Sequence, residues 1–165
     1  MLINERQVLR EIRRGGIDQT FMIHCYETLS DRKSLYFVLD FVPGGELRIY
    51  VKQKMGAAPE ARRLFLAQIV LGLEALHSKD IIYRDLKLQN LMIGADGYIK
   101  FIDFGFSKRL KDRTFTPCGT AAYLAPEILA KVGYSYPVDV WALGILICEM
   151  VGGSPFYDHD EKVML

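Results

Sequence analysis

Two aspartates, a lysine and an asparagine lie close together in this chain, at intervals that suit one kind of chemistry. Asp85, Lys87 and Asn90 fall within six residues, and Asp103 follows 18 residues after Asp85. An ionised carboxylate can accept a proton from a hydroxyl nucleophile, and a lysine can neutralise charge on a phosphate. Amide and carboxylate oxygens are hard ligands of the kind that Mg²⁺ prefers. Together these groups are the parts that phosphoryl transfer requires.

The elements around this stretch must position the four side chains. Between Asn90 and Asp103 the sequence predicts two short strands, 91–93 and 98–102, joined by a turn at 95–97. Ahead of the stretch, apolar residues recur at the helical period over 59–78, which predicts a long helix. The candidate residues therefore follow a helix and flank a hairpin.

The remaining patterns predict an α+β protein with a strand-rich first part and a helical second part. The first part is expected to contain a helix over 4–12 and strands over 21–29 and 35–42. The second part is expected to contain a loop over 110–122, helices over 125–130 and 138–151, and a loop followed by a helix start over 152–165. Pro43-Gly44-Gly45 ends the second strand and predicts a hinge with a cleft beside it.

Bulk composition argues against several classes of protein. The chain has 165 residues and a formal net charge of +1, so no global field favours nucleic acid or an anionic membrane surface. The longest apolar run, 140–148, is about half of the roughly 20 residues that a membrane span needs. Asp139 and Glu149 bracket this run, which predicts a buried helix. The three cysteines are widely spaced, which predicts reduced thiols, no zinc site and a cytoplasmic location.

Several short motifs resemble those of eukaryotic protein kinases, in particular the AGC group with its cyclic-AMP- and cyclic-GMP-dependent members. They are Val42-Pro-Gly-Gly-Glu46, Tyr83-Arg-Asp-Leu-Lys-Leu-Gln-Asn90, Asp103-Phe-Gly-Phe-Ser-Lys108, Thr116-Pro-Cys-Gly-Thr120 and Tyr123-Leu-Ala-Pro-Glu127. The resemblance covers residues 4–156 and implies a partial protein-kinase-like fold. Residues 1–42 would be the end of the β-rich N-lobe, 43–46 the hinge, and 47–165 the first part of the helical C-lobe.

The resemblance implies an ATP- and Mg²⁺-dependent transferase that phosphorylates serine or threonine. Asp85 would accept or orient the proton of the substrate hydroxyl, and Lys87 would neutralise charge on the transferred group. Lys87 also favours serine/threonine over tyrosine specificity. Thr120 matches the threonine that braces these two side chains, while Asn90 and Asp103 would hold Mg²⁺.

The same resemblance implies an adenine site beside the hinge. The cofactor-binding residues that it implies are Leu39, Asp40, Val42, Glu46, Met92 and Ile102. Leu39 matches the residue that gates the pocket, and Met92 the residue beneath adenine; ordinary core packing is compatible with either position. Glu46 matches a contact to the ribose and to a basic residue of the substrate.

Four residues match regulatory positions of the family: Thr116, Arg84, Lys108 and Glu5. Thr116 aligns with the activation-loop phosphosite. A phosphate there would bring about −1.5 to −2 charges, pair with Arg84 and Lys108, and order the loop. The alternative is an unmodified loop threonine. Glu5 matches the glutamate of the helix called αC in this family.

Some family elements have no counterpart in these 165 residues. A Gly-rich phosphate loop and a strand lysine paired with Glu5 would precede them, and the end of the C-lobe would follow. The resemblance is thus to a fragment, and the chain alone is expected to have negligible kinase activity. The alternatives are a non-catalytic kinase-like scaffold or binding module, and a small-molecule phosphotransferase. The second is disfavoured because such enzymes lack a segment like 116–127.

The implied partners are protein or peptide substrates with basic residues upstream of the target serine or threonine. Glu46 and Glu149 would supply acidic contacts to those residues. Gln89 stands where basophilic members carry glutamate, which weakens the expected preference. A regulatory subunit or domain would lie outside the chain, and neither nucleic acid nor a membrane is expected as a partner.

Overall fold

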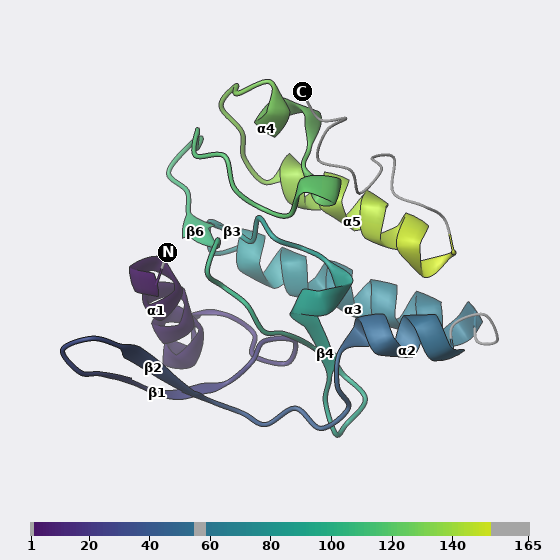
Figure 1. The fold of residues 1–165 in the computed structure, drawn as a ribbon, viewed down its shortest axis with the longest axis horizontal. Coiled ribbons are helices and arrows are strands. Elements are labelled where there is room, and N and C mark those ends of the chain that lie inside the picture. The colour runs from purple at the N-terminus through teal and green to yellow at the C-terminus, as the bar shows by residue number, and fades with distance from the viewer. Residues whose placement is uncertain (1, 55–58, 153–165) are drawn as a thin grey trace.

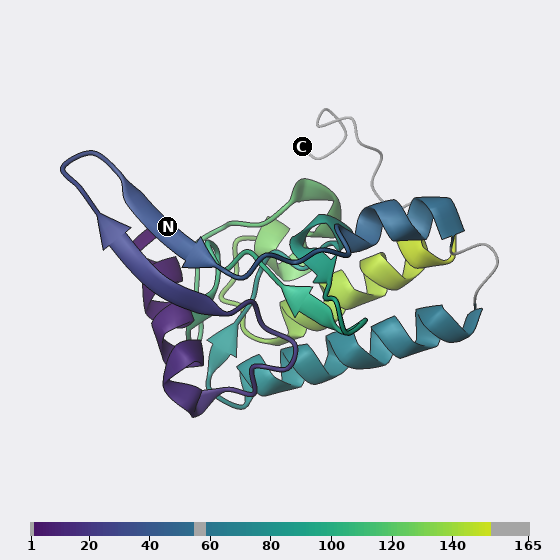
Figure 2. The same cartoon turned by 90° about the horizontal axis from the view of Figure 1, so that it is seen from below.

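A computed structural model describes residues 2–54 and 59–152 of the chain. The described residues combine helices with three two-stranded antiparallel sheets, as expected for an α+β protein. The β1–β2 hairpin and helix α1 lie at one end of the molecule, and helices α2, α3 and α5 lie together at the other (Figures 1 and 2). Apart from Gly152, the predicted loop and helix start over 152–165 fall outside the described residues.

The first part of the chain contains the helix and hairpin that its patterns predict. Helix α1 spans Leu2–Glu11 and continues into one π-helical turn, η1, at Ile12–Gly16. Strands β1 (Cys25–Ser30) and β2 (Leu35–Leu39) form an antiparallel pair. The apolar face of α1 is buried, because Val8 and Leu9 belong to the main hydrophobic core.

The predicted strand over 21–29 is wrong in its first half, because residues 21–23 and the strand that begins at Cys25 pair with different partners. The N–H of Phe101 donates to the carbonyl of Phe21 at 2.8 Å, and the N–H of Ile23 donates to the carbonyl of Phe101 at 3.0 Å. Phe21, Met22 and Ile23 are all buried, so their backbone groups need partners inside the molecule. Strand β1 therefore begins only at Cys25, and β2 likewise ends at Leu39 rather than at residue 42.

The predicted long helix is α3, Pro59–His77, and it supports the hairpin at the centre of the molecule. Strands β4 (Leu91–Ile93) and β5 (Ile99–Phe101) pair as expected. A Cβ at Gly72 of α3 would come within 2.4 Å of the Phe101 ring, so only glycine lets the helix approach β5 this closely. The side chain of Gln68 also accepts the Ile99 N–H at 2.7 Å.

Several short elements complete the described part. Helix α2, Leu47–Lys54, was not predicted; its β-branched and aromatic residues give weak helix propensity, and burial of Leu47 docks it on the core. The helices predicted over 125–130 and 138–151 are α4 (Pro126–Leu129) and α5 (Pro137–Met150). The remaining elements are β3 (Ile81–Ile82), 3₁₀ turn η3 (Leu88–Asn90), β6 (Lys108–Arg109) and 3₁₀ turn η4 (Ala121–Tyr123).

The central hairpin is held along both of its edges. On the β4 edge, the Gly44 N–H donates to the Ile93 carbonyl at 2.9 Å, and the Ile93 N–H donates to the Gly45 carbonyl at 3.0 Å. A Cβ at Gly44 would lie 2.3 Å from the Ile93 carbonyl oxygen, so the close approach requires glycine. On the β5 edge, Phe101 pairs with residues 21–23. Residues 21–23 of the first part and the glycines of the predicted hinge thus hydrogen-bond to opposite edges of one hairpin.

Within the described residues, none of the helices combines the length and the hydrophobicity that a membrane crossing requires.

Candidate active site

The side chains of Asp85, Lys87, Asn90 and Thr120 form one hydrogen-bonded cluster. Asp85 Oδ2 accepts from Lys87 Nζ and from Asn90 Nδ2, each at 2.8 Å, and Asp85 Oδ1 accepts from Thr120 Oγ1 at 2.7 Å. Lys87 Nζ also donates to Thr120 Oγ1 at 2.8 Å. The side chain of Asp85 is buried, and its donors come from points up to 35 residues away in the chain. The cluster fixes the orientation of both carboxylate oxygens.

Asn90 and Asp103 present the oxygen donors that a magnesium ion accepts. Asn90 Nδ2 donates to both the carbonyl and the carboxylate of Asp85, so its amide oxygen points away from that residue. Asp103 Oδ1 accepts the Gly105 N–H at 2.8 Å, which orients the carboxylate. In the described ranges, no three His, Cys, Asp or Glu side chains gather as a metal site. Two protein ligands suit Mg²⁺, which keeps several waters and substrate oxygens in its shell.

A buried aspartate in α5 holds the backbone just before Asp85. Asp139 is 1% exposed, and its carboxylate accepts the N–H of Tyr83 and the N–H of Arg84, each at 2.8 Å. His77 Nε2 lies 2.7 Å from the same carboxylate. Arg84 has a φ of 71°, a conformation that costs a non-glycine residue about 1–3 kcal/mol. The two backbone hydrogen bonds from Asp139 help to maintain that conformation.

Glu5 on α1 faces the same region from the first part of the chain. Burial raises the pKa of the Glu5 carboxyl, and the nearby charge of Asp103 raises it further. The backbone N–H of Phe104 acts in the opposite direction. Phe104 itself packs edge-on against Tyr83, with ring centroids 5.6 Å apart. Glu5 is thus close to the predicted metal ligand, although 98 residues separate them.

The six residues predicted to bind the nucleotide lie around residues 39–46 and β4. Glu46 forms an isolated antiparallel bridge with Met92, so these two are brought together. Val42 is buried, and Met92 and Ile102 pack against the main core. Leu39 pairs with Cys25 across the β1–β2 hairpin. The Asp40 carboxylate accepts a hydrogen bond from the Tyr26 hydroxyl at 2.6 Å. Asp40 and Val42 also line a hollow of about 260 Å³, and the other four predicted nucleotide-binding residues do not line it.

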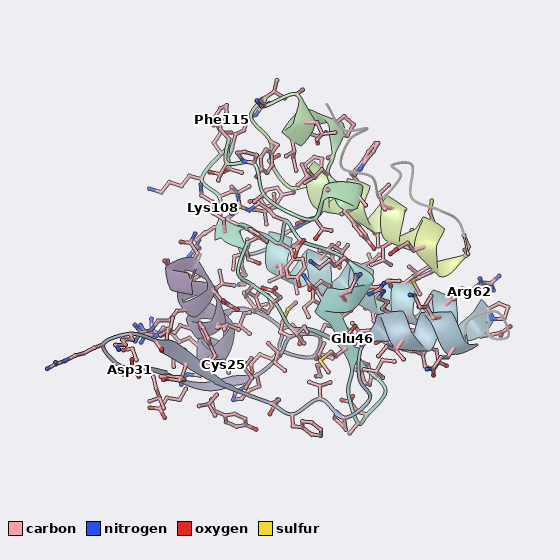
Figure 3. All side chains as sticks on the ribbon, in the orientation of Figure 1. Cys25, Asp31, Glu46, Arg62, Lys108 and Phe115 are labelled. Carbon is pink, nitrogen blue, oxygen red and sulfur yellow. The ribbon has the colours of Figure 1, made fainter. Side chains whose placement is uncertain are left out.

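The regulatory residues are brought together only in part. Arg84 Nε donates to the Phe106 carbonyl at 2.6 Å, and Lys108 Nζ donates to Thr114 Oγ1 at 3.2 Å. Lys108 and Phe115 lie on the same side of the molecule, away from Glu46 (Figure 3). Thr116 is exposed. Lys108 therefore contacts the loop two residues before the predicted phosphosite.

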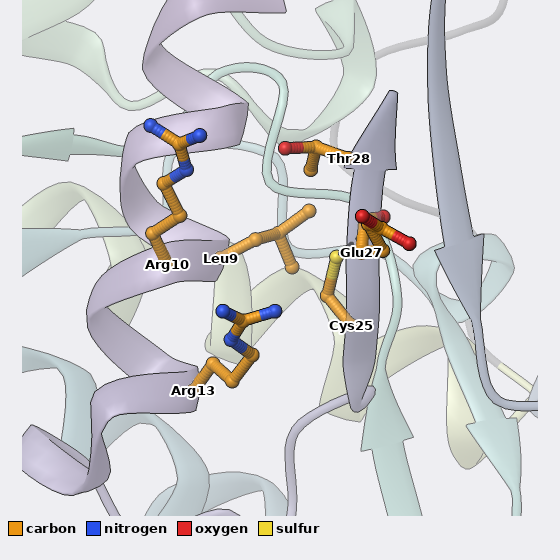
Figure 4. A pocket seen from close by; sticks show the side chains of 6 residues that line it. All are labelled: Leu9, Arg10, Arg13, Cys25, Glu27 and Thr28. Carbon is orange, nitrogen blue, oxygen red and sulfur yellow. Dashed lines mark hydrogen bonds between the residues drawn. The ribbon is translucent and has the colours of Figure 1, made fainter.

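A second hollow, of about 150 Å³, lies between α1 and β1 (Figure 4). Its lining residues are Leu9, Arg10, Arg13, Cys25, Glu27 and Thr28. Leu9 and Cys25 face each other across its floor. None of these residues belongs to the cluster around Asp85.

The profile of the protein kinase domain matches residues 1–164. The chain therefore belongs to the protein kinase domain family, and its α+β fold is that of part of a kinase domain.

Three of the similar curated proteins are catalytic subunits of cyclic-AMP-dependent protein kinases. The chain is 48% identical over 147 residues to "cAMP-dependent protein kinase catalytic subunit" of Dictyostelium discoideum, covering 88% of this chain and 23% of that protein. It is 48% identical over 167 residues to catalytic subunit 3 of Drosophila melanogaster, covering 98% and 28%. It is 45% identical over 158 residues to the human catalytic subunit PRKX, covering 95% and 43%. These findings confirm the predicted resemblance to the AGC group, and the chain spans less than half of each of these relatives.

Two functional contacts were missed by the sequence reasoning. Asp139 was placed at the start of a buried helix but given no role. Tyr134, whose hydroxyl accepts from Arg84 Nη1 at 3.2 Å, was not singled out. An aspartate bordering an apolar run indicates a buried carboxylate with hydrogen-bonding partners, because a buried charge needs such partners. The identity of those partners, 55 and 56 residues earlier, could not be read from the pattern.

Proposed function

We propose that the full-length protein transfers the γ-phosphoryl group of ATP to serine or threonine residues of protein substrates. The observation that carries this proposal is the cluster in which Lys87, Asn90 and Thr120 all donate to the Asp85 carboxylate. Membership of the protein kinase domain family supports it.

In the proposed mechanism, Asp85 orients the substrate hydroxyl and accepts its proton. The hydroxyl oxygen bonds to the γ-phosphorus while the bond from that phosphorus to ADP, the leaving group, breaks. Lys87 Nζ, held between Asp85 and Thr120, places a positive charge beside the transferred group. Thr120 braces both side chains and fixes their separation. ATP with Mg²⁺ supplies the phosphoryl group, and the ion would be held by Asn90 Oδ1 and the Asp103 carboxylate.

We propose that adenine binds near residues 39–46, with Met92 beneath it and Ile102, Leu39 and Val42 around it. Pairing of Glu46 with Met92 supports a common site for the ribose and the adenine ring. Residues 1–42 would then act as the N-lobe portion, 43–46 as the hinge, and 47–165 as the C-lobe portion.

The proposed substrates carry basic residues upstream of the target. Glu46 and Glu149 supply negative charge, and the Tyr123 hydroxyl donates to the Glu149 carboxylate and orients it. Burial, and next the Glu149 carboxylate, raise the pKa of Tyr123, so its hydroxyl remains a donor. Gln89 contributes no negative charge, so we propose only a moderate preference for basic residues upstream of the target.

We propose that phosphorylation of Thr116 activates the protein. Arg84 is largely buried, yet within the described residues no carboxylate lies within ion-pair distance of its guanidinium. A phosphate on exposed Thr116 would supply the missing negative charge. We also propose that a regulatory subunit or domain lies outside this chain. The three free thiols support a cytoplasmic location, which we propose as well.

The test is a phosphoryl-transfer assay on the full-length protein with basic serine peptides and Mg²⁺–ATP. Asp85→Asn is expected to lower kcat by about 10²–10⁴-fold, because the proton acceptor is lost. Asp112→Asn, on the exposed loop, is the matched control and should leave kcat unchanged. Nucleotide binding without any transfer by the wild-type protein would instead support a non-catalytic binding module.

A further inference from the structure

Tyr134 lies between α4 and α5, and its side chain is 4% exposed. Its backbone pairs with Thr114 in both directions: the Thr114 N–H donates to the Tyr134 carbonyl at 2.9 Å, and the Tyr134 N–H donates to the Thr114 carbonyl at 3.0 Å. These two hydrogen bonds fix the position of Thr114, and the loop that carries Phe115 and Thr116 starts from it.

The Tyr134 hydroxyl makes a second attachment to that loop. It donates to the Thr116 carbonyl at 2.5 Å and accepts from Arg84 Nη1 at 3.2 Å. Cys118 Sγ lies 3.7 Å from the same oxygen. Burial raises the pKa of Tyr134, so the hydroxyl keeps the proton that it donates. One neutral group therefore connects the predicted phosphosite to the arginine beside Asp85.

The loop contacts Arg84 from its other side as well. Gly119 has a φ of 113°, and a Cβ there would lie 2.7 Å from the Arg84 carbonyl oxygen. Arg84 is thus held by Asp139 through its N–H, by Gly119 through close packing, and by Tyr134 through its guanidinium. Any shift of the loop at 116–119 would be transmitted to the residue next to Asp85.

We propose that Tyr134 is a positioning residue whose hydroxyl latches residues 114–118 onto Arg84 while Thr116 is unphosphorylated. The latch gives the loop part of the order that a phosphate on Thr116 would otherwise supply. Arg84 has five N–H donors, so it can bind a phosphate without releasing the tyrosine. A phosphate on Thr116 would then hold the loop as well, so the hydroxyl matters most before phosphorylation. The inference rests on the proposed function for the phosphorylation of Thr116 and for the consequences on catalysis.

The test compares Tyr134→Phe with wild type in the full-length protein by hydrogen exchange. Phenylalanine keeps the ring and the backbone pair with Thr114 and removes only the hydroxyl. In the unphosphorylated protein, amide exchange over 114–118 should become about tenfold faster, as expected for the loss of hydrogen bonds to a buried hydroxyl. Exchange in α5 should not change. Tyr136→Phe, which removes an exposed hydroxyl 3.4 Å from Asp80, is the matched control and should leave 114–118 unchanged.

The same comparison is then made with phosphothreonine encoded at position 116. The effect of Tyr134→Phe on exchange should fall to less than about twofold, because the phosphate now holds the loop. In an activity assay, unphosphorylated Tyr134→Phe should lose about tenfold in kcat with little change in KM for ATP.

Three results would overturn the latch: unchanged exchange over 114–118, equally faster exchange in α5, or an equal effect with and without the phosphate. Exchange does not depend on catalysis, so a protein without transferase activity still tests the latch. Conversely, full activity with unchanged exchange rejects the latch and leaves the proposed function standing.

Discussion

At the scale of single residues, the site depends on how one carboxylate is shared among its donors. Asp85 receives three side-chain hydrogen bonds, and Thr120 both donates to Asp85 and accepts from Lys87. A lone aspartate and a lone lysine this close would form a simple ion pair and could lie in several orientations. The threonine hydroxyl keeps them in one orientation. In the proposed mechanism, the amine and the carboxylate then act on different atoms of the substrates.

Replacement of Thr120 by valine tests this role. Valine has nearly the same shape but no hydroxyl, so Asp85 and Lys87 each lose one partner. We expect kcat to fall about 10- to 100-fold, equivalent to roughly 1.4–2.8 kcal/mol of transition-state stabilisation. KM for ATP should change little. Thr120→Ser, which keeps the hydroxyl, should retain most activity; a valine variant with wild-type kcat would show that the brace is unnecessary.

Glu5 predicts a pH dependence of stability in the 165-residue chain. The native pKa of Glu5 is raised, so the native state binds the proton more tightly than the unfolded state, in which a glutamate has a pKa of about 4.3. The free energy of unfolding should therefore fall as pH rises from that value through the raised native pKa. Glu5→Gln should remove this decrease and become more stabilising, relative to wild type, at pH 7 than at pH 4.

Denaturant titrations at the two pH values measure this difference, and Glu60→Gln at the exposed start of α3 is the control. An equal effect of Glu5→Gln at both pH values would contradict the raised pKa. In a longer chain that places a lysine beside Glu5, the opposite charge would lower the pKa and reverse the sign.

At the scale of elements, helix α5 supports the catalytic stretch through its first turn. The sequence indicated a buried helix here because of its unbroken apolar run, and the structure agrees to within one residue at each end. The contact from Asp139 to Tyr83 and Arg84 was not predictable, because periodicity reports which face is buried but not which distant backbone group it meets. The same limit explains β3 and β6, whose two-residue lengths carry no period.

Asp139→Ala should therefore be costly. It leaves two buried backbone N–H groups without acceptors and removes the partner of His77, so we expect a loss of about 3 kcal/mol in the free energy of unfolding. The kcat should fall as well, because Arg84 would leave its strained conformation. Glu74→Ala on the exposed face of α3 is the control. Wild-type stability measured by denaturant titration of Asp139→Ala would show that another group maintains the conformation of Arg84.

Strand prediction failed where two pairing partners compete for one apolar run. Residues 21–29 read as a single strand because β-branched and aromatic residues recur through them, but the chain changes partner at His24. The proposed catalytic residues stand out in the sequence for a different reason. Their chemistry requires particular side chains at short spacings, which a sequence displays directly, whereas Tyr134 acts through a single hydroxyl on a loop.

At the scale of the whole molecule, the two parts of the chain meet at the β4–β5 hairpin. Residues 44–45 hydrogen-bond to its β4 edge, and residues 21–23 to its β5 edge. Asn90 comes just before β4 and Asp103 just after β5, so the two proposed metal ligands lie at the ends of the same hairpin. The Ile102 N–H also donates to the Asn90 carbonyl at 3.2 Å, which ties these ends together. Movement between the two parts would strain both edges before it separated Asn90 from Asp103.

This arrangement predicts that Mg²⁺ and ATP together stabilise the full-length protein more than either alone. At a nucleotide concentration about 100-fold above Kd, the free energy of unfolding should increase by about 2.7 kcal/mol. Asp103→Asn keeps the acceptor for Gly105 but loses the charge that attracts the cation, so the Mg²⁺-dependent part of the shift should disappear. Thermal unfolding with ATP, with and without Mg²⁺, measures this, and Asp112→Asn is the control. A shift in Asp103→Asn equal to that of wild type would mean that the ion is held elsewhere, and the hairpin would then position only the nucleotide.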